Sequence, residues 1–200
     1  MDVGIYVFDD VEVLDFAGPF EVFATASRIH ARAKPPADEL FTLHVIGERV
    51  RPVPARGGLT VTCTQSFTTH PPLDVLLVPG GDVTRELENG ATLRWIAETA
   101  RSTRITASIC NGAFLLGKAG LLDGHRATTH WEDVRAFQEM FPNVPVLEGP
   151  RWVDEGPIVT SAGISAGLDM SLHLVARLGG EDLAVSTARQ MDYSWQDSGV

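Results

Sequence analysis

The sequence predicts an α/β protein in which helices pack on both faces of a mostly parallel sheet. Short apolar runs that are typical of buried strands alternate with stretches in which apolar residues recur at helical spacing. The 200 residues are 44% hydrophobic, with a mean hydropathy of +0.04, which is enough for one full core and excludes a disordered chain. We find no repeat, linker or low-complexity stretch, so we expect a single domain over residues 1–200.

The first half of the chain opens on a buried strand, Val3–Phe8. A helix is expected over Asp15–Ala31, with Pro19 in its first turn and Lys34-Pro35-Pro36 ending it. The elements expected next are a strand at Phe41–Ile46, a hairpin of Arg49–Pro54 with Leu59–Thr62, a buried strand at Asp74–Val78 and a helix at Thr84–Ala100.

The second half continues the alternation of strands and helices. We expect a strand at Arg104–Ile109, a helix at Gly112–Ala119, a short strand at Arg126–His130, a helix at Trp131–Met140, a hairpin of Trp152–Val153 with Pro157–Thr160, and helices at Ser165–Leu178 and Glu181–Met191. Helices between successive strands imply crossover connections, and therefore parallel pairing.

One cysteine lies on a predicted strand-to-helix turn. In Ile105–Gly117, read as ITASICNGAFLLG, an apolar β-branched run stops at Cys110, and small residues follow before a helical pattern begins. A thiol at the N-terminus of a helix has a lowered pKa and reacts as the thiolate, so the segment predicts a nucleophile elbow with sulfur in place of a serine hydroxyl. Because cysteine is often a small core residue, Cys110 alone does not decide between the two roles.

Four candidate positions follow predicted strands: Asp15, Gly80-Gly81, Cys110 and His130. Sites in parallel sheets lie at the carboxyl ends of the strands, so this coincidence favours a reactive Cys110. Asp15 stands in the apolar setting Val13-Leu14-Asp15-Phe16. It is either a helix N-cap or a carboxyl whose pKa is raised by burial, in which case the protonated group can donate a hydrogen bond to the thiolate.

Composition restricts the function classes. A net charge of −10 and a pI near 4.9 weigh against nucleic-acid partners, and no apolar run is long enough to span a membrane. Cys63 and Cys110 are far apart, and the N-terminus carries no signal-peptide pattern, so we expect a reduced, cytoplasmic protein. The histidines show no ligand spacing, and we therefore expect neither a metal nor another cofactor.

Four segments together resemble the ThiJ/PfpI superfamily, which is class I glutamine amidotransferase-like. They are FDDVEVLDFAGPFEVF (8–23), PPLDVLLVPGG (71–81), SICNGAFLLGKAGLLDGHRATTHW (108–131) and VTSAGISAGLDMSLHLVARL (159–178). The resemblance implies a flavodoxin-like three-layer sandwich and a homodimer. The pattern is most similar to the isonitrile hydratase branch and also resembles the sensor half of AraC-type regulators. Because the chain ends before a helix-turn-helix region, we expect no DNA binding.

The same resemblance assigns the site. It implies that Cys110 is the nucleophile, that Asp15 is its acidic partner, and that the backbone N–H groups of Gly81 and Asn111 form an anion-binding pocket. Gly80, His130 and Trp131 are possible pocket residues, although Gly80 also suits an ordinary turn and Trp131 a core position. Asn111 departs from the family, since protease-like members carry His there and isonitrile hydratases carry Thr. This departure argues against a Cys-His dyad.

The function predicted first is cysteine-dependent hydration or hydrolysis of a small carbon–nitrogen electrophile, most like the conversion of an isonitrile to an N-substituted formamide. Glyoxalase or deglycase activity on small carbonyls is a second enzyme hypothesis. A third hypothesis, from another class, is a redox or ligand sensor that uses Cys110 without turnover.

Overall fold

The computed structural model describes residues 1–33 and 39–200, and its centre is a seven-stranded sheet with the order β5-β2-β1-β6-β7-β9-β8. Its strands are β1 (Asp2–Tyr6), β2 (Thr42–Gly47), β5 (Gln65–Ser66), β6 (Val75–Val78), β7 (Ile105–Ile109), β8 (Trp152–Asp154) and β9 (Ile158–Ser161). Neighbouring strands pair in parallel except β8 with β9. The strands β3 (Pro52–Pro54) and β4 (Thr60–Thr62) form a separate antiparallel hairpin.

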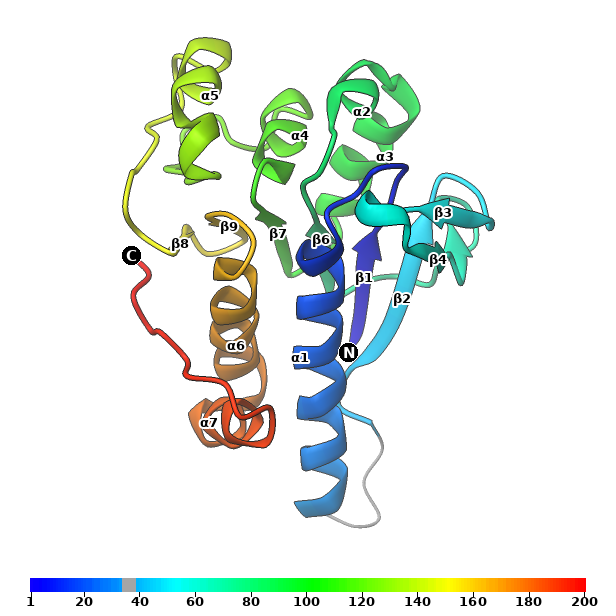
Figure 1. The fold of residues 1–200 in the computed structure, drawn as a ribbon, viewed down its shortest axis with the longest axis vertical. Helices are drawn as coiled ribbons and strands as arrows, with labels where there is room; N and C mark the ends of the chain where they lie inside the picture. The colour runs from blue at the N-terminus through cyan, green and yellow to red at the C-terminus, as the bar shows by residue number, and fades with distance from the viewer. Residues whose placement is uncertain (34–38) are drawn as a thin grey trace.

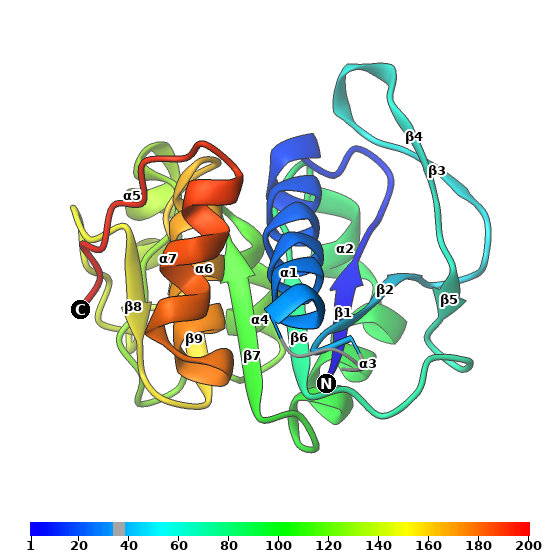
Figure 2. The same cartoon turned by 90° about the horizontal axis from the view of Figure 1, so that it is seen from below.

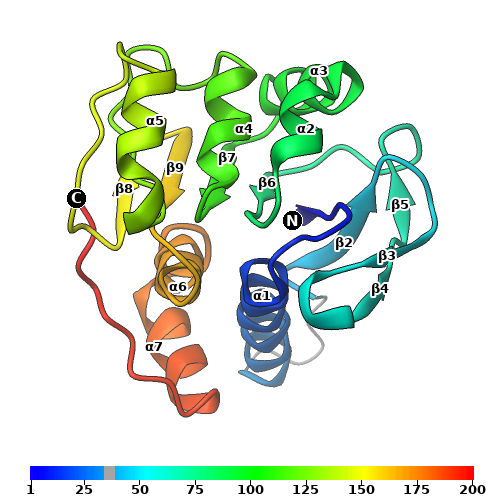
Figure 3. The same cartoon turned by 45° about the horizontal axis from the view of Figure 1, so that its top comes forward.

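Helices cover both faces of the large sheet, so the expected three-layer α/β sandwich is confirmed (Figures 1 and 3). The helices are α1 (Val13–Ala33), α2 (Thr84–Glu88), α3 (Gly90–Ala100), α4 (Gly112–Lys118), α5 (Val134–Met140), α6 (Ala166–Gly179) and α7 (Glu181–Gln190). Helix α1 packs against α6 and α7 on one face, and α2 to α5 lie on the other (Figure 3). Figure 2 shows the protein from below the view of Figure 1, with the β3–β4 hairpin projecting from the sheet.

The central strands β6 and β7 lie in the interior of the protein. Every residue of β6 and β7 is buried, since helices cover both of their faces. Strands that are buried on both sides read as continuous apolar runs instead of alternating ones. The sequence VLLV of β6 follows this pattern, whereas β7 (ITASI) also contains Thr106 and Ser108, both of which are buried.

The site is positioned by the order of the strands. From β1 the chain passes to β2 on one side of it, whereas β6 and β7 follow on the other side. Between β1 and β6 the direction of strand addition therefore reverses, and ligands bind at such a reversal beyond the carboxyl ends of the strands. The residues that follow β1, β6 and β7 meet at this place (Figure 1).

Four local predictions were wrong. The helix expected over Thr84–Ala100 is broken at Asn89, whose side chain accepts hydrogen bonds from the N–H groups of Ala91 and Thr92 and so caps a new helix, α3. The strand expected at Arg126–His130 is only one bridge, Ala127 to Val146.

The other two differences lie at helix starts. Trp131–Asp133 forms a 3₁₀ turn before α5, and not the first turn of an α-helix. Helix α1 begins at Val13, so Pro19 lies inside it and not in the first turn. The predicted helix end at Lys34-Pro35-Pro36 falls outside the described residues, and the strand β5 had no counterpart in the prediction. Within residues 1–33 and 39–200, no helix is long and apolar enough to cross a membrane.

Candidate active site

Cys110 occupies a strained turn between β7 and α4. Its φ angle is +56°, in the left-handed region that non-glycine residues rarely adopt. Two hydrogen bonds hold this conformation: the Cys110 N–H donates to the Ala162 carbonyl (3.3 Å), and the Thr129 hydroxyl donates to the Cys110 carbonyl (3.0 Å). Strain that the surrounding structure maintains in this way is typical of functional sites, and the geometry is that of the predicted nucleophile elbow.

Asp15 brings a carboxyl group to the same place from α1. It lies in the first turn of the helix, and its exposed fraction is 0%. Oδ2 accepts a hydrogen bond from the Gly80 N–H (3.1 Å), whereas Oδ1 is buried and has no hydrogen-bond partner in the described part of the chain. Burial is the main cause that raises the pKa of Asp15 to about 7, and the Gly80 hydrogen bond opposes it. The side chain faces the site and does not cap the helix.

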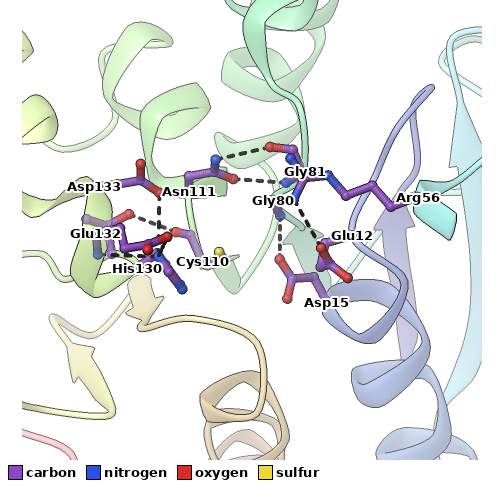
Figure 4. Close-up of polar contacts among 11 residues, drawn as sticks. Glu12, Asp15, Arg56, Gly80, Gly81, Cys110, Asn111, His130, Glu132 and Asp133 are labelled. Carbon is purple, nitrogen blue, oxygen red and sulfur yellow. Dashed lines mark hydrogen bonds and ion pairs between the residues drawn. The ribbon is translucent and has the colours of Figure 1, made fainter.

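The Cys110 thiol faces Asp15, and each group affects the titration of the other (Figure 4). Burial raises the pKa of Cys110 to about 12, and the negative charge of Asp15 raises it further, while the N–H groups of Asn111 and Ile164 lower it. The expectation of a lowered thiol pKa was therefore wrong. A seven-residue helix behind the sulfur does not outweigh the loss of solvation and a neighbouring carboxylate.

One proton held between the two groups reconciles this result with a reactive sulfur. The state with a thiol and a carboxylate contains as many protons as the state with a thiolate and a protonated Asp15. Transfer of the proton from Cys110 to Asp15 forms the nucleophile and removes the charge that opposes it. Asp15 can thus act as a general base toward this thiol.

The Gly81 N–H is not free, contrary to the expectation for an anion-binding pocket. It donates to Oδ1 of Asn111 (2.9 Å), and Nδ2 of Asn111 donates to the Gly81 carbonyl (3.1 Å) (Figure 4). The Asn111 side chain thus pairs with both polar groups of Gly81. The Asn111 N–H, by contrast, lowers the pKa of the Cys110 thiol.

A cavity of about 270 Å³ opens over Cys110, Asn111 and Gly81. The other side chains that line it are those of Glu12, Arg56, His130, Glu132, Asp133 and Ile164. Arg56 is paired with Glu12 (3.2 Å), so the remaining charged groups on the wall are acidic. These are Glu132 and Asp133, from the 3₁₀ turn before α5.

His130 lines this cavity, but the described residues include no hydrogen bond between it and Cys110. Its Nδ1 accepts a weak hydrogen bond from the Glu132 N–H (3.3 Å) and lies 3.9 Å from the Asp133 carboxylate. His130 forms a polar wall beside the sulfur.

Two predicted pocket positions, and the second cysteine, lie apart from the cavity. Gly80 donates a hydrogen bond to Asp15 and does not line the cavity, and Trp131 is 74% exposed and does not line it either. Cys63 is buried elsewhere, and burial raises its pKa. In the ranges 1–33 and 39–200, no group of three or more potential ligands is placed to hold a metal ion.

Sequence reasoning missed three contributors to the site. Ile164 has a φ angle of +43°, and its N–H lowers the pKa of the Cys110 thiol. The Thr129 hydroxyl donates to the elbow carbonyl, and Arg56 reaches the cavity from the β3–β4 hairpin. The glycine-containing turn after β9 was the only local signal for Ile164. Thr129 and Arg56 reach the site through contacts that are distant in sequence, and no local pattern marks them.

Comparisons with known proteins agree with this geometry. The family model described as "DJ-1/PfpI family" matches residues 1–177. The chain is 34% identical to an isonitrile hydratase of Pseudomonas putida, over 97% of this chain and 79% of that protein. It is also 34% identical to the HTH-type transcriptional regulator CdhR of Pseudomonas aeruginosa, over 89% of this chain but only 51% of the regulator.

A solved structure of a ThiJ/PfpI family protein from Pseudomonas syringae superposes with a TM-score of 0.85 at 29% identity, covering 96% of this chain and 75% of that one. The family model, the sequence relatives and this structure extend over nearly the whole chain, in the order of the segments that build the site. The chain belongs to the DJ-1/PfpI family.

Proposed function

We propose that this protein hydrates an isonitrile to an N-substituted formamide, with Cys110 as the nucleophile and Asp15 as the proton-transfer group. The observation that carries the proposal is the buried Asp15 carboxyl, whose Oδ1 has no partner in the described structure and which faces the thiol on a strained elbow. The similarity to an isonitrile hydratase over 97% of the chain supports the choice of substrate class.

In the first step Asp15 takes the proton of Cys110, and the sulfur adds to the terminal carbon of the isonitrile. Asp15 then returns the proton to that same carbon. The product is a thioimidate, R–N=CH–S–Cys110, in which one C–S and one C–H bond have formed and the carbon–nitrogen triple bond has become a double bond. The N–H groups of Asn111 and Ile164 stabilise the sulfur while it carries charge.

In the second step Asp15 removes a proton from water, and the oxygen adds to the thioimidate carbon. The nitrogen takes up a proton, which gives R–NH–CH(OH)–S–Cys110. Loss of the sulfur then releases R–NH–CHO, and the hydroxyl proton returns to the Asp15–Cys110 pair. Water is the only co-reactant, and the enzyme ends as it began.

Further parts of the proposal depend on the family. We propose a homodimer that works in the cytoplasm as one domain, since two-fold dimers are the commonest assemblies and the DJ-1/PfpI match runs through most of the chain. Light scattering at micromolar concentrations checks the assembly, with a mass near twice 21.6 kDa expected. A mass of 21.6 kDa at every concentration contradicts it.

The direct test follows formation of formamide from an aryl isonitrile by chromatography. Wild type is expected to form it, Cys110→Ala to form none because no other group supplies the sulfur, and Cys63→Ser to keep the wild-type rate. The last variant is the matched control, because Cys63 is buried away from the cavity. If wild type forms no formamide above the buffer blank, the proposed reaction is wrong.

A ligand-sensing role is a second candidate, favoured by the similarity to the regulator CdhR. The chain spans about half the length of that relative, so it matches one part of a longer regulator. Turnover distinguishes the two functions. A sensor binds its ligand in the cavity over Cys110 without converting it, and its affinity survives Cys110→Ser, whereas the enzyme loses product formation.

A further inference from the structure

The side-chain amide of Asn111 pairs with both backbone polar groups of Gly81. The Gly81 N–H donates to Oδ1 (2.9 Å), and Nδ2 donates to the Gly81 carbonyl (3.1 Å). Both polar atoms of the side chain are thus used on one residue. A side chain at Gly80 would overlap Oδ1 of Asn111, so the glycine makes room for this pair.

The backbone at Gly81 is itself held in place by hydrogen bonds and packing, so its N–H stays at the cavity. Gly81 forms an isolated β-bridge with Val11, and the neighbouring Glu12 N–H donates to the Gly80 carbonyl (2.9 Å). A Cβ built on Gly81 would overlap the backbone of residues 10–12, so this segment packs closely against Gly81. The Gly81 N–H therefore becomes free only when the Asn111 side chain moves.

This N–H is the donor that a carbonyl substrate needs. Attack of Cys110 on an ester, a thioester or a 2-oxoaldehyde places a negative charge on the carbonyl oxygen, and a backbone N–H in the wall beside the sulfur is placed to stabilise it. Loss of one such donor slows acyl transfer by about 10²- to 10³-fold in enzymes that use it.

Addition to an isonitrile makes no such demand. The sulfur and the proton both go to the terminal carbon, and the substrate contains no oxygen on which charge develops in this step. A site in which a side chain occupies the Gly81 N–H is therefore compatible with the isonitrile and unfavourable for the carbonyl compound.

We propose that Asn111 determines substrate specificity because its side chain occupies the backbone N–H of Gly81. Carbonyl substrates are thereby excluded from reaction with Cys110. The proposal rests on the proposed function for the identity of the nucleophile and of the accepted substrate. The side chain of Asn111 selects the substrate, whereas its backbone N–H stabilises the charge on the sulfur.

The test uses p-nitrophenyl acetate as the carbonyl probe. Cys110 attacks the acetyl carbon, p-nitrophenolate leaves, and water hydrolyses the acetyl thioester. Asn111→Ala and Asn111→Ser both remove the amide, since a serine hydroxyl is too short to bridge to Gly81. We expect kcat/KM for the ester to rise at least tenfold in either variant, and the gain to disappear when Cys110→Ala is added.

Asn143→Ala is the matched control, because Asn143 is exposed and lies outside the cavity; we expect no gain from it. Amide hydrogen exchange gives a second readout: the Gly81 N–H is protected in wild type and exchanges faster in both Asn111 variants. A Gly81 N–H that exchanges in wild type like an unprotected amide overturns the proposal. Variants with a freed N–H and an unchanged ester rate also overturn it.

The same data separate this inference from the proposed reaction. If wild type forms no formamide but the Asn111 variants gain Cys110-dependent ester hydrolysis, isonitrile hydration is wrong and the exclusion of carbonyl substrates stands. If wild type forms formamide and the variants gain nothing, the reaction stands and the role of Asn111 fails.

Discussion

Two carboxyl groups of this protein, Asp15 and Asp169, have the same burial and opposite surroundings. Each lies in the first turn of a helix on the same face of the sheet, Asp15 in α1 and Asp169 in α6, and each has an exposed fraction of 0%. Asp169 accepts hydrogen bonds on both oxygens, from Arg151 (2.5 Å), the Tyr193 hydroxyl (3.1 Å) and the Gln196 N–H (2.8 Å). Asp15 accepts one, from Gly80.

The difference is the one expected between a structural carboxylate and a proton-transfer group, which is the role that we propose for Asp15. A buried charge that is paired and fully hydrogen-bonded holds neighbouring segments together, and at Asp169 these are α6, the start of β8 and the C-terminal residues. A buried carboxyl with an unpartnered oxygen retains its proton to higher pH and can exchange it with a neighbour. Burial alone therefore does not identify a catalytic acid, whereas the count of its partners does.

The largest expected effect is on stability, at Asp169. Asp169→Ala leaves the Arg151 guanidinium and the Tyr193 hydroxyl without their partner, and we expect it to lower the free energy of unfolding by about 3 kcal/mol or more. Urea unfolding followed by circular dichroism measures this. The control is Glu139→Ala, which breaks an exposed ion pair with Arg135 and is expected to cost less than about 1 kcal/mol. Equal costs for the two variants contradict the structural role of Asp169.

The next effect is on catalysis, at Asp15. Asp15→Asn keeps the shape of the side chain but removes proton transfer, so we expect kcat for isonitrile hydration to fall by about 100-fold or more. Asp123→Asn, in an exposed turn, is the control and is expected to keep the wild-type rate. A wild-type rate for Asp15→Asn leaves Cys110 as the nucleophile but removes Asp15 from the mechanism.

Asp15→Asn is also expected to change the stability of the fold, in a direction opposite to Asp169→Ala. A carboxyl whose folded pKa is raised from 3.8 to about 7 lowers the stability of the fold as the pH rises through that interval, because the folded state must hold an unfavourable charge. Asp15→Asn removes this charge, so it is expected to be more stable than wild type by about 2–4 kcal/mol at pH 8, with little difference at pH 4. Urea unfolding at both pH values checks it; a variant that is less stable than wild type at pH 8 contradicts the unfavourable charge on Asp15.

The sequence predicted those features that depend on local pattern. The continuous apolar run of β6 identified that strand, and the change from the β-branched and apolar residues of β7 to Cys110-Asn111-Gly112 identified the elbow. The rule that residues after parallel strands meet at one edge of the sheet placed Asp15 at the same edge as Cys110, and the family resemblance implied that it is the partner of the sulfur.

The rest depends on partners that are distant in the chain. Gly81 and Asn111 are 30 residues apart, and no property of either residue shows that the side chain of one occupies the N–H of the other. Asp15 and Asp169 also read alike in the sequence, since both stand among apolar residues at a helix start. The thiol pKa was mispredicted for the same reason: the helix N-terminus is a local feature, whereas the burial and the carboxylate that outweigh it come from the tertiary fold.

We propose that Asp15 exchanges a proton with Cys110, and the titration of the Asp15 carboxyl group gives the decisive measurement. The ¹³C resonances of aspartate carboxyl groups are followed from pH 3 to pH 9 in wild type, and the resonance that disappears in Asp15→Asn is assigned to Asp15. We predict a midpoint for Asp15 at about pH 7. A midpoint near the ordinary value of about 4 would contradict the account, because an ionised Asp15 with that pKa retains no tendency to take the proton of Cys110.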